Sequence, residues 1–125
     1  MDASERERLV TDWIVMHHAT EDSEEYERHR WADVRLSELV REDPDLALEL
    51  ILSILARDTS DRVVSNLAAG PVEDLLGEHG DEVIAAVEGI ARGNAEFKRL
   101  LGGVWQGEMP DRVWERVKAV AATAW

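Results

Sequence analysis

Histidines and carboxylates near the N-terminus are the side chains of this 125-residue sequence that could most readily do chemistry. His17, His18 and His29 flank a short acidic stretch, whose acids are Glu21, Asp22, Glu24 and Glu25. Imidazole and carboxylate groups are the ligands that zinc and other divalent ions take in proteins. The spacing, however, matches neither HExxH nor Glu-x-x-His, two arrangements that hold metal on helices. We therefore expect no metal ligand here, and instead a solvated acidic loop beside partly buried histidines.

A second group of carboxylates with a histidine lies in the middle of the chain, at Glu73, Asp74, Glu78 and His79. Glu73 and Asp74 fall in the first turn of an expected helix that begins at Pro71, where negative charge complements the helix dipole. His79 falls in the last turn of that helix, where a cation is favoured. No nucleophile or oxyanion donor stands beside these residues. Helix-end electrostatics therefore explains them, and we expect no catalytic residue.

The composition and the motifs present exclude several kinds of site. The chain has no cysteine, which excludes disulfides, cysteine-ligated zinc and thiol nucleophiles. Gly102-Gly103 matches neither GxGxxG nor GxxxxGKS/T, and we expect no cofactor. The N-terminus leads into no apolar signal sequence, and the densest apolar run, 46–56, is too short to span a bilayer. These features predict a cytoplasmic protein.

The formal net charge is −13, from 27 acidic and 14 basic residues. A surface this acidic repels nucleic acid backbones and anionic membranes, so we expect neither as a direct partner. It favours a basic protein partner and speeds the encounter with one. The alternative interpretation is that the acidity only keeps the protein soluble.

Apolar periodicity predicts an all-α fold, because no window alternates cleanly between β-branched and polar residues as a strand would. We expect about seven to eight helices in a single compact domain that spans residues 1–125. They run over about 4–19, 23–41, 44–56, 60–69, 71–79, 81–92, 94–105 and from 110 onward. The third is apolar nearly all round, which is typical of a helix at the centre of its domain.

Local signals predict the helix boundaries. Gly70-Pro71 is expected to end one helix and begin the next, and Gly80 to end that helix in a left-handed conformation. Gly102-Gly103 is costly within a helix, so either the helix frays there or another backbone packs closely against it. Side chains suited to cap a helix N-terminus stand at Ser4, Ser23, Asp43, Ser60 or Thr59, and Asn94.

The tryptophans and aliphatic side chains are expected mainly in the core. Trp105 and Trp114 are predicted to be packing anchors near the C-terminus. The buried positions expected of the second helix are Trp31, Val34 and Leu39, flanked by Leu36 and Val40.

Three segments, 46–52, 66–80 and 97–105 followed by 109–114, together resemble a bacterial domain-of-unknown-function family of small all-helical proteins. The resemblance covers roughly residues 30–120 and is most specific in Leu-Ala-Ala-Gly-Pro-Val-Glu-Asp-Leu-Leu at 67–76. The family has no established activity or catalytic residues, so the resemblance implies a fold and a bacterial origin but no function. The expected antiparallel helix pairs also resemble HEAT-like or armadillo-like stacking, with an irregular helical bundle as the competing architecture.

Taken together, these features favour a small acidic protein-binding module without enzymatic activity. We predict a basic protein partner, and in a specific version an immunity-like or antitoxin-like protein that neutralises a basic toxin. Two alternatives stay open: a metal-dependent or His/Glu enzyme using His17, His18 and His29 with Glu21, and an inhibitor whose carboxylates imitate nucleic acid phosphates. A homo-oligomer is also compatible with the sequence. The candidate partner contacts are Glu21, Asp22, Glu24, Glu25, Glu73, Asp74 and Trp125.

Overall fold

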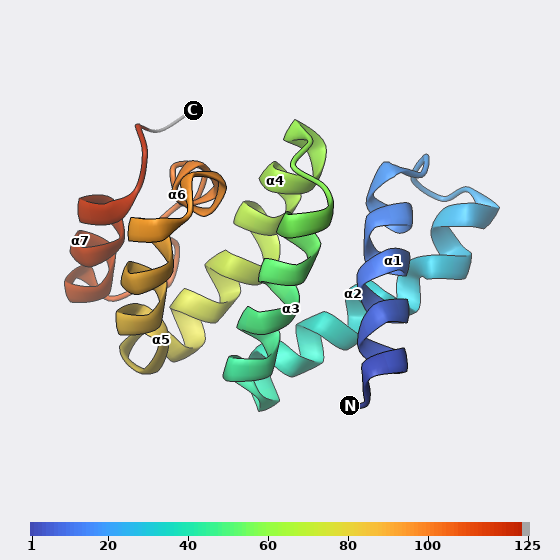
Figure 1. Ribbon diagram of the computed structural model, residues 1–125, viewed down its shortest axis with the longest axis horizontal. Coiled ribbons are helices and arrows are strands. Elements are labelled where there is room, and N and C mark those ends of the chain that lie inside the picture. Colours follow the sequence, from blue (N-terminus) through green and yellow to red (C-terminus); the bar gives the residue numbers. More distant parts are fainter. Residues whose placement is uncertain (124–125) are drawn as a thin grey trace.

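The computed structural model of the chain describes residues 1–123, and over this range it is helical with no strand (Figure 1). The all-α prediction is therefore confirmed. The described range holds seven α-helices and one π-helical turn, η1. Their bounds are α1 (Ala3–His18), α2 (Glu24–Glu42), α3 (Pro44–Arg57), α4 (Asp61–Leu67), η1 (Ala68–Val72), α5 (Glu73–Gly93), α6 (Ala95–Leu101) and α7 (Asp111–Val120).

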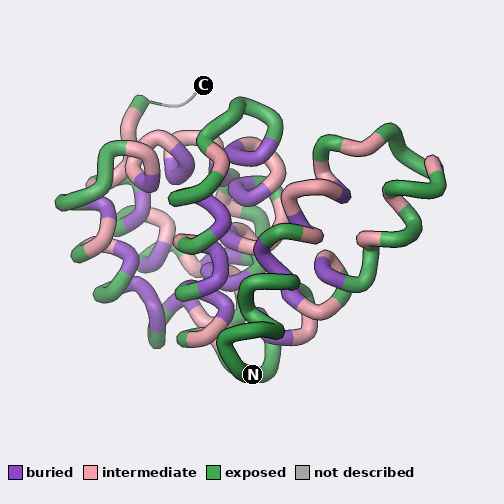
Figure 2. The backbone as a smooth tube through the Cα atoms, turned by 45° about the vertical axis from the view of Figure 1, so that its right-hand side comes forward, coloured by how far each residue is buried: buried purple, intermediate pink, exposed green. Residues whose placement is uncertain are grey.

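The helices lie side by side along the long axis of the molecule, with α1 and α2 at one end and α7 at the other (Figure 1). Buried positions alternate with exposed ones along the helices, so that each helix turns one side inward (Figure 2). The predicted central position of α3 is confirmed, because it contacts α1, α2, α4, α5 and α6 and buries Leu50, Ile51 and Ile54. Across residues 1–123, no helix is both long and apolar enough to cross a bilayer.

Most of the predicted helix caps are confirmed, since capping is a contact within a single turn. The cap of α1 differs: Asp2, not Ser4, accepts a hydrogen bond from the backbone N–H of Glu5 at 2.8 Å. Two suitable side chains stand near this N-terminus, and local sequence did not decide between them. Four predicted caps are confirmed, because each cap side chain accepts a hydrogen bond from the backbone N–H three residues ahead. These caps are Ser23, Asp43, Ser60 and Asn94.

The predicted break at Gly70-Pro71 is wrong. The chain passes through this point as η1, which joins α4 to α5 with helical conformation at both of its ends. In a regular α-helix the Pro71 ring would clash with the carbonyl of Leu67, and Pro71 has no N–H to donate. A π-helical turn is wider and accommodates such a residue inside a helix. The helical path therefore continues from Asp61 to the kink at His79.

The predicted helix boundary at His79-Gly80 is confirmed, because the helical conformation is interrupted at His79 (φ −130°, ψ 27°) and α5 consists of two helical segments joined by a kink there. The predicted left-handed conformation of Gly80 is wrong. The Nε2–H of His79 donates to the carbonyl of Arg41 at 3.0 Å, which ties the kink to the end of α2. A Cβ on Gly80 would lie 2.9 Å from Cγ1 of Val113. Gly80 is thus explained by close packing of α7, and the left-handed glycine of the described residues is Gly107 (φ 50°).

The buried face of α2 differs from the predicted one. Trp31 and Val34 are exposed, with 36% and 47% of their surface accessible. Leu39 is buried as predicted, and Leu36 and Val40, predicted at the edge of the face, are buried with it. Contacts with α1 and α3 on either side select this face, and those contacts are not visible in the periodicity of α2 alone.

The segment after α6 also departs from the prediction at one residue. Trp105 is 77% exposed and is no core anchor, whereas Trp114 packs partly buried against the core. Both explanations offered for Gly102-Gly103 are confirmed: the helix expected over 94–105 ends at Leu101, and another backbone packs closely against Gly102. A Cβ on Gly102 would lie 3.0 Å from the carbonyl oxygens of both Ala122 and Thr123.

Candidate functional site

The start of α5 and the loop 102–110 together form the most distinctive polar surface of the described residues. Glu73 follows η1 directly, and its Oε2 accepts a hydrogen bond from the backbone N–H of Trp105 at 3.4 Å. Gly107 adopts a left-handed conformation and approaches the same carboxylate, since a Cβ there would lie 3.6 Å from Oε1 of Glu73. The loop is thereby held against the first turns of α5.

The Gln106 side chain stabilises this loop from within. Its Nε2 donates to the carbonyl of Met109 at 3.0 Å and to Oδ1 of Asp111 at 2.7 Å. Met109 is buried in the core, so it anchors the loop next to the start of α7. The position of Glu108 beside α5 is therefore determined by packing and hydrogen bonds.

Carboxylates gather in a hollow between α5 and this loop. The hollow has a volume of about 200 Å³ and is lined by Glu73, Asp74, Gly77, Glu78, Gly107 and Glu108. A second hollow of about 200 Å³ shares Gly77 and Glu78 with the first and continues along α5 past the His79 kink to Glu82 and Pro110. We call the carboxylates Glu73, Asp74, Glu78 and Glu108 with this hollow the acidic groove.

No cation of the chain neutralises the acidic groove within the described residues, where none of its four carboxylates forms an ion pair. Burial and the nearby charge of Glu78 raise the pKa of the Asp74 carboxyl above its ordinary value. Asp81, seven residues after Asp74 along α5, shows the contrast. Arg112 binds it through two nitrogens and lowers the pKa of Asp81. The acidic groove therefore has unbalanced negative charge.

The other predicted acidic group does not join this groove. Glu21 and Asp22 lie in the connection between α1 and α2, while Glu24 and Glu25 form the first turn of α2. This connection lies at the α1–α2 end of the molecule, away from α7 (Figure 1). Its four acids are exposed, and Asp22 adopts a positive φ of 64°. We call Glu21, Asp22, Glu24 and Glu25 the acidic loop.

His17 takes part in a partly buried polar network at the junction of three helices. Its Nε2–H donates to Oδ1 of Asp33 at 3.0 Å, and its Nδ1 lies 2.9 Å from the amide nitrogen of Asn66. Its ring stacks on the buried Trp13 with 3.7 Å between the ring centroids. Both imidazole nitrogens are thus used to join α1, α2 and α4, in agreement with the expectation of partly buried histidines.

The remaining histidines of the N-terminal group have different partners. Nε2 of His18 lies 2.8 Å from Oδ2 of Asp58, and Nδ1–H of His29 donates to the carbonyl of Glu25 at 2.8 Å. Among the described residues, no three His, Cys, Asp or Glu side chains come together as a metal site would require. The structure therefore does not bring His17, His18 and His29 to one point.

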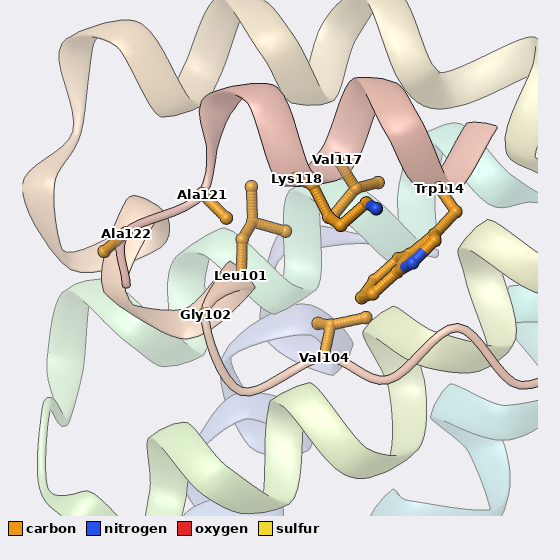
Figure 3. A pocket seen from close by; sticks show the side chains of 8 residues that line it. All are labelled: Leu101, Gly102, Val104, Trp114, Val117, Lys118, Ala121 and Ala122. Carbon is orange, nitrogen blue, oxygen red and sulfur yellow. The ribbon is translucent and has the colours of Figure 1, made fainter. Parts of the chain in front are cut away.

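An apolar hollow, which the sequence did not indicate, lies on the other side of the loop 102–110. Side chains from α7 and from the end of α6 point toward one another across it (Figure 3). Its volume is about 260 Å³, and its lining is Leu101, Gly102, Val104, Trp114, Val117, Lys118, Ala121 and Ala122. Trp105 is the residue that could have indicated a surface site here. Its exposure depends on the tertiary structure, so the sequence does not show it. Trp125, a predicted partner contact, lies outside the described residues.

Comparison with known proteins places the chain beside an uncharacterised group. The model of a family of unknown function (DUF6869) matches residues 19–125, a range that contains all of the acidic groove. The resemblance to an uncharacterised domain family is thereby confirmed, and the bacterial origin stays a prediction. No curated protein and no solved structure is significantly similar to the chain.

Proposed function

Because the chain belongs to this family of unknown function, we propose its role from its own surface: it is a protein-binding module that receives a basic partner in the acidic groove. The observation that carries the proposal is the gathering of four carboxylates without a neutralising cation. Glu73 and Asp74, expected from the sequence to be partner contacts, form its wall together with Glu78 and Glu108.

Electrostatics gives the reason why a basic partner would favour this position. Partial burial and repulsion from Glu78 raise the free energy of the ionised Asp74 carboxyl in the unbound protein, as its raised pKa indicates. A Lys or Arg side chain from a partner would relieve that repulsion and would be attracted by the whole molecule, whose net charge is −13. Complementary charge of this kind increases the association rate and selects against acidic partners.

A specific version of the proposal is an immunity-like or antitoxin-like role, in which the partner is a basic toxin neutralised by occlusion. The acidity of the chain and the position of its unpaired carboxylates in a groove support this version. A groove contacts more of a partner side chain than a flat surface does, so binding there can block the partner's own cationic site. The acidic loop is the second candidate contact and serves as the comparison in the test.

Two variants with matched charge test the proposal. The groove variant carries Glu73→Gln, Asp74→Asn, Glu78→Gln and Glu108→Gln, while the loop variant carries Glu21→Gln, Asp22→Asn, Glu24→Gln and Glu25→Gln. Each removes four negative charges and keeps the side-chain size. Wild type and both variants serve as bait for proteins of the native host, and captured proteins are identified and titrated at increasing salt.

We expect wild type and the loop variant to capture the same basic protein at low salt, and the groove variant to lose it. Exposed ion pairs contribute roughly 0.5 kcal/mol each, so losing four would weaken Kd by about thirtyfold. If the groove variant captures the basic protein as well as wild type does, the groove is not the binding site. If no basic protein is enriched by any bait, the proposed function is wrong.

A further inference from the structure

The apolar hollow and the acidic groove lie on opposite sides of one short stretch of chain. Val104 lines the apolar hollow, and the next residue, Trp105, donates its backbone N–H to Glu73 in the wall of the acidic groove. Trp105 itself is 77% exposed, so a large aromatic surface stands in water on the stretch of chain that connects the two hollows. A partner that lies across this stretch can contact both hollows and Trp105 at once.

The size and lining of the apolar hollow suit a single side chain. A cavity of about 150 Å³ already holds a benzene molecule, whereas small-molecule sites usually measure about 300–1,000 Å³. The hollow of about 260 Å³ thus has room for one Leu, Phe or Trp side chain and little more. The side chains of Leu101, Val104 and Val117 give it an apolar wall, and Trp114 closes one side (Figure 3).

The rim of the apolar hollow has no uncompensated charge. Nζ of Lys118 lies 5.7 Å from the centre of the Trp114 ring and 3.0 Å from Oε1 of Glu115. The carboxylate of Glu115 therefore balances the cation at the rim. An apolar side chain entering the hollow meets no unpaired charge there, while a cationic neighbour on the same partner is attracted to the acidic groove.

We propose that the partner docks through a basic segment that carries one large apolar side chain, which enters the apolar hollow while flanking Arg or Lys side chains enter the acidic groove. The indole of Trp105 contacts the part of the partner segment that lies between the apolar hollow and the acidic groove. Aromatic residues at the centre of an interface often dominate its binding energy. This inference rests on the proposed function and adds the chemistry of the partner to it.

Charge decides against a second copy of the chain as the occupant. Two copies with a net charge of −13 each repel one another, and each would bring acidic surface toward the other's acidic groove. A partner of opposite charge gains from the same field. The apolar hollow thus supplies contact area for a partner that the charge of the molecule has already attracted.

A synthetic amphipathic peptide of Arg and Leu is the probe, with one control peptide in which Leu is replaced by Ala and another in which Arg is replaced by Gln. Binding is measured by calorimetry, and the indole N–H signals of the protein are followed by NMR. Ala121→Leu fills the apolar hollow, and Trp105→Ala removes the exposed indole without touching the core. Trp31→Ala, which removes a tryptophan of α2 that lines neither hollow, is the control.

We expect the Arg–Leu peptide to shift the Trp105 and Trp114 signals and to leave that of the buried Trp13 in place. Ala121→Leu and Trp105→Ala should each weaken its binding about tenfold, and Trp31→Ala should not. The peptide without Leu should bind about tenfold more weakly, at the acidic groove alone. Melting curves of all variants establish that they are folded.

Three results would overturn the inference. If the peptide without Leu binds equally well and Ala121→Leu has no effect, the apolar hollow is not used, and the acidic groove alone remains. If the groove variant binds the Arg–Leu peptide as wild type does, the proposed function fails as well. If the protein is a dimer in solution that Ala121→Leu dissociates, the occupant is a second copy.

Discussion

At the scale of single residues, two aspartates of α5 that stand seven positions apart have opposite electrostatic surroundings. Partial burial, together with the nearby charge of Glu78, raises the pKa of Asp74 from the ordinary 3.8. Asp81 is bound by Arg112, and its pKa is lowered from the same value. A shift in the folded state is a statement about stability, so the two residues should affect unfolding in opposite directions.

Asp74→Asn should raise the melting temperature at pH 7. The carboxyl with a raised folded pKa contributes stability that is complete below its ordinary pKa and is lost as pH rises through the folded value. At pH 7 Asp74 is therefore ionised at a cost to the folded state, which asparagine avoids. The gain should disappear as the pH approaches 3.8, and melting followed by circular dichroism from pH 7 down to pH 3.8 measures it.

Asp81→Asn is the matched control and should lower the melting temperature at pH 7. Its lowered pKa contributes stability above the ordinary value that is lost as pH falls through the folded one. Both variants remove one negative charge, so relief of the overall charge cannot explain a difference in sign. Equal shifts of the two variants would contradict the electrostatic assignment of Asp74. If the Asp74→Asn variant melts at a higher temperature and also binds the partner more weakly, Asp74 serves binding at the expense of stability.

At the scale of helices, α5 contains glycines with very different surroundings. Gly80 is buried, and a Cβ there would lie 2.9 and 3.0 Å from the two methyl carbons of Val113 in α7. Gly89 is exposed, and a Cβ there would meet nothing within 4 Å. Gly89 lies inside a helix and Gly80 begins the helical segment after the kink at His79. Within a helix, alanine is the better residue by about 1 kcal/mol.

Gly80→Ala should destabilise the protein, and Gly89→Ala should stabilise it. Overpacking against Val113 costs about 1–3 kcal/mol, which exceeds the gain in helix propensity, so we expect a net loss of about 1 kcal/mol at Gly80. At Gly89 the propensity gain is unopposed and should be at most about 1 kcal/mol. Urea unfolding measures both, and equal stabilisation by the two substitutions would show that α7 does not pack on Gly80 as described.

The sequence predicts the end of a helix correctly where the deciding contact lies within a single helical turn. Ser23, Asp43 and Asn94 cap their helices because each needs only the N–H three residues ahead. Pro71 was misread because a π-helical turn lets a helix continue through proline, and the sequence pattern of such a turn equals that of a break. Trp31 was misread because neighbouring helices, not the sequence of α2, select its buried face.

At the scale of the whole molecule, the candidate site depends on contacts between distant parts of the chain. Glu73 and Asp74 were recognisable as an acidic pair, but Glu108 joins them only because Gln106 and Gly107 shape the loop against α5. The apolar hollow likewise needs α6 and α7 together. The all-α class follows from composition and periodicity, whereas these surfaces follow from packing between segments that are distant in the sequence, from Glu73 to Glu108 in the acidic groove and from Leu101 to Ala122 in the apolar hollow.

Net charge makes the stability of the whole molecule depend on salt. Raising NaCl from about 0.01 M to about 0.15 M shortens the Debye length from about 30 Å to about 8 Å, which screens repulsion across the molecule. Salt also weakens the exposed ion pairs, but these contribute little each, so relief of a net charge of −13 should prevail. We expect calorimetry at pH 7 to show a melting temperature higher by about 4 °C, which corresponds to roughly 1 kcal/mol.

Near pH 4.6, where the net charge vanishes, the rise in melting temperature with salt should be absent. A melting temperature that falls with salt at pH 7 would mean that the ion pairs outweigh the surplus negative charge, and the attraction of a basic partner by the molecule as a whole would lose its physical basis.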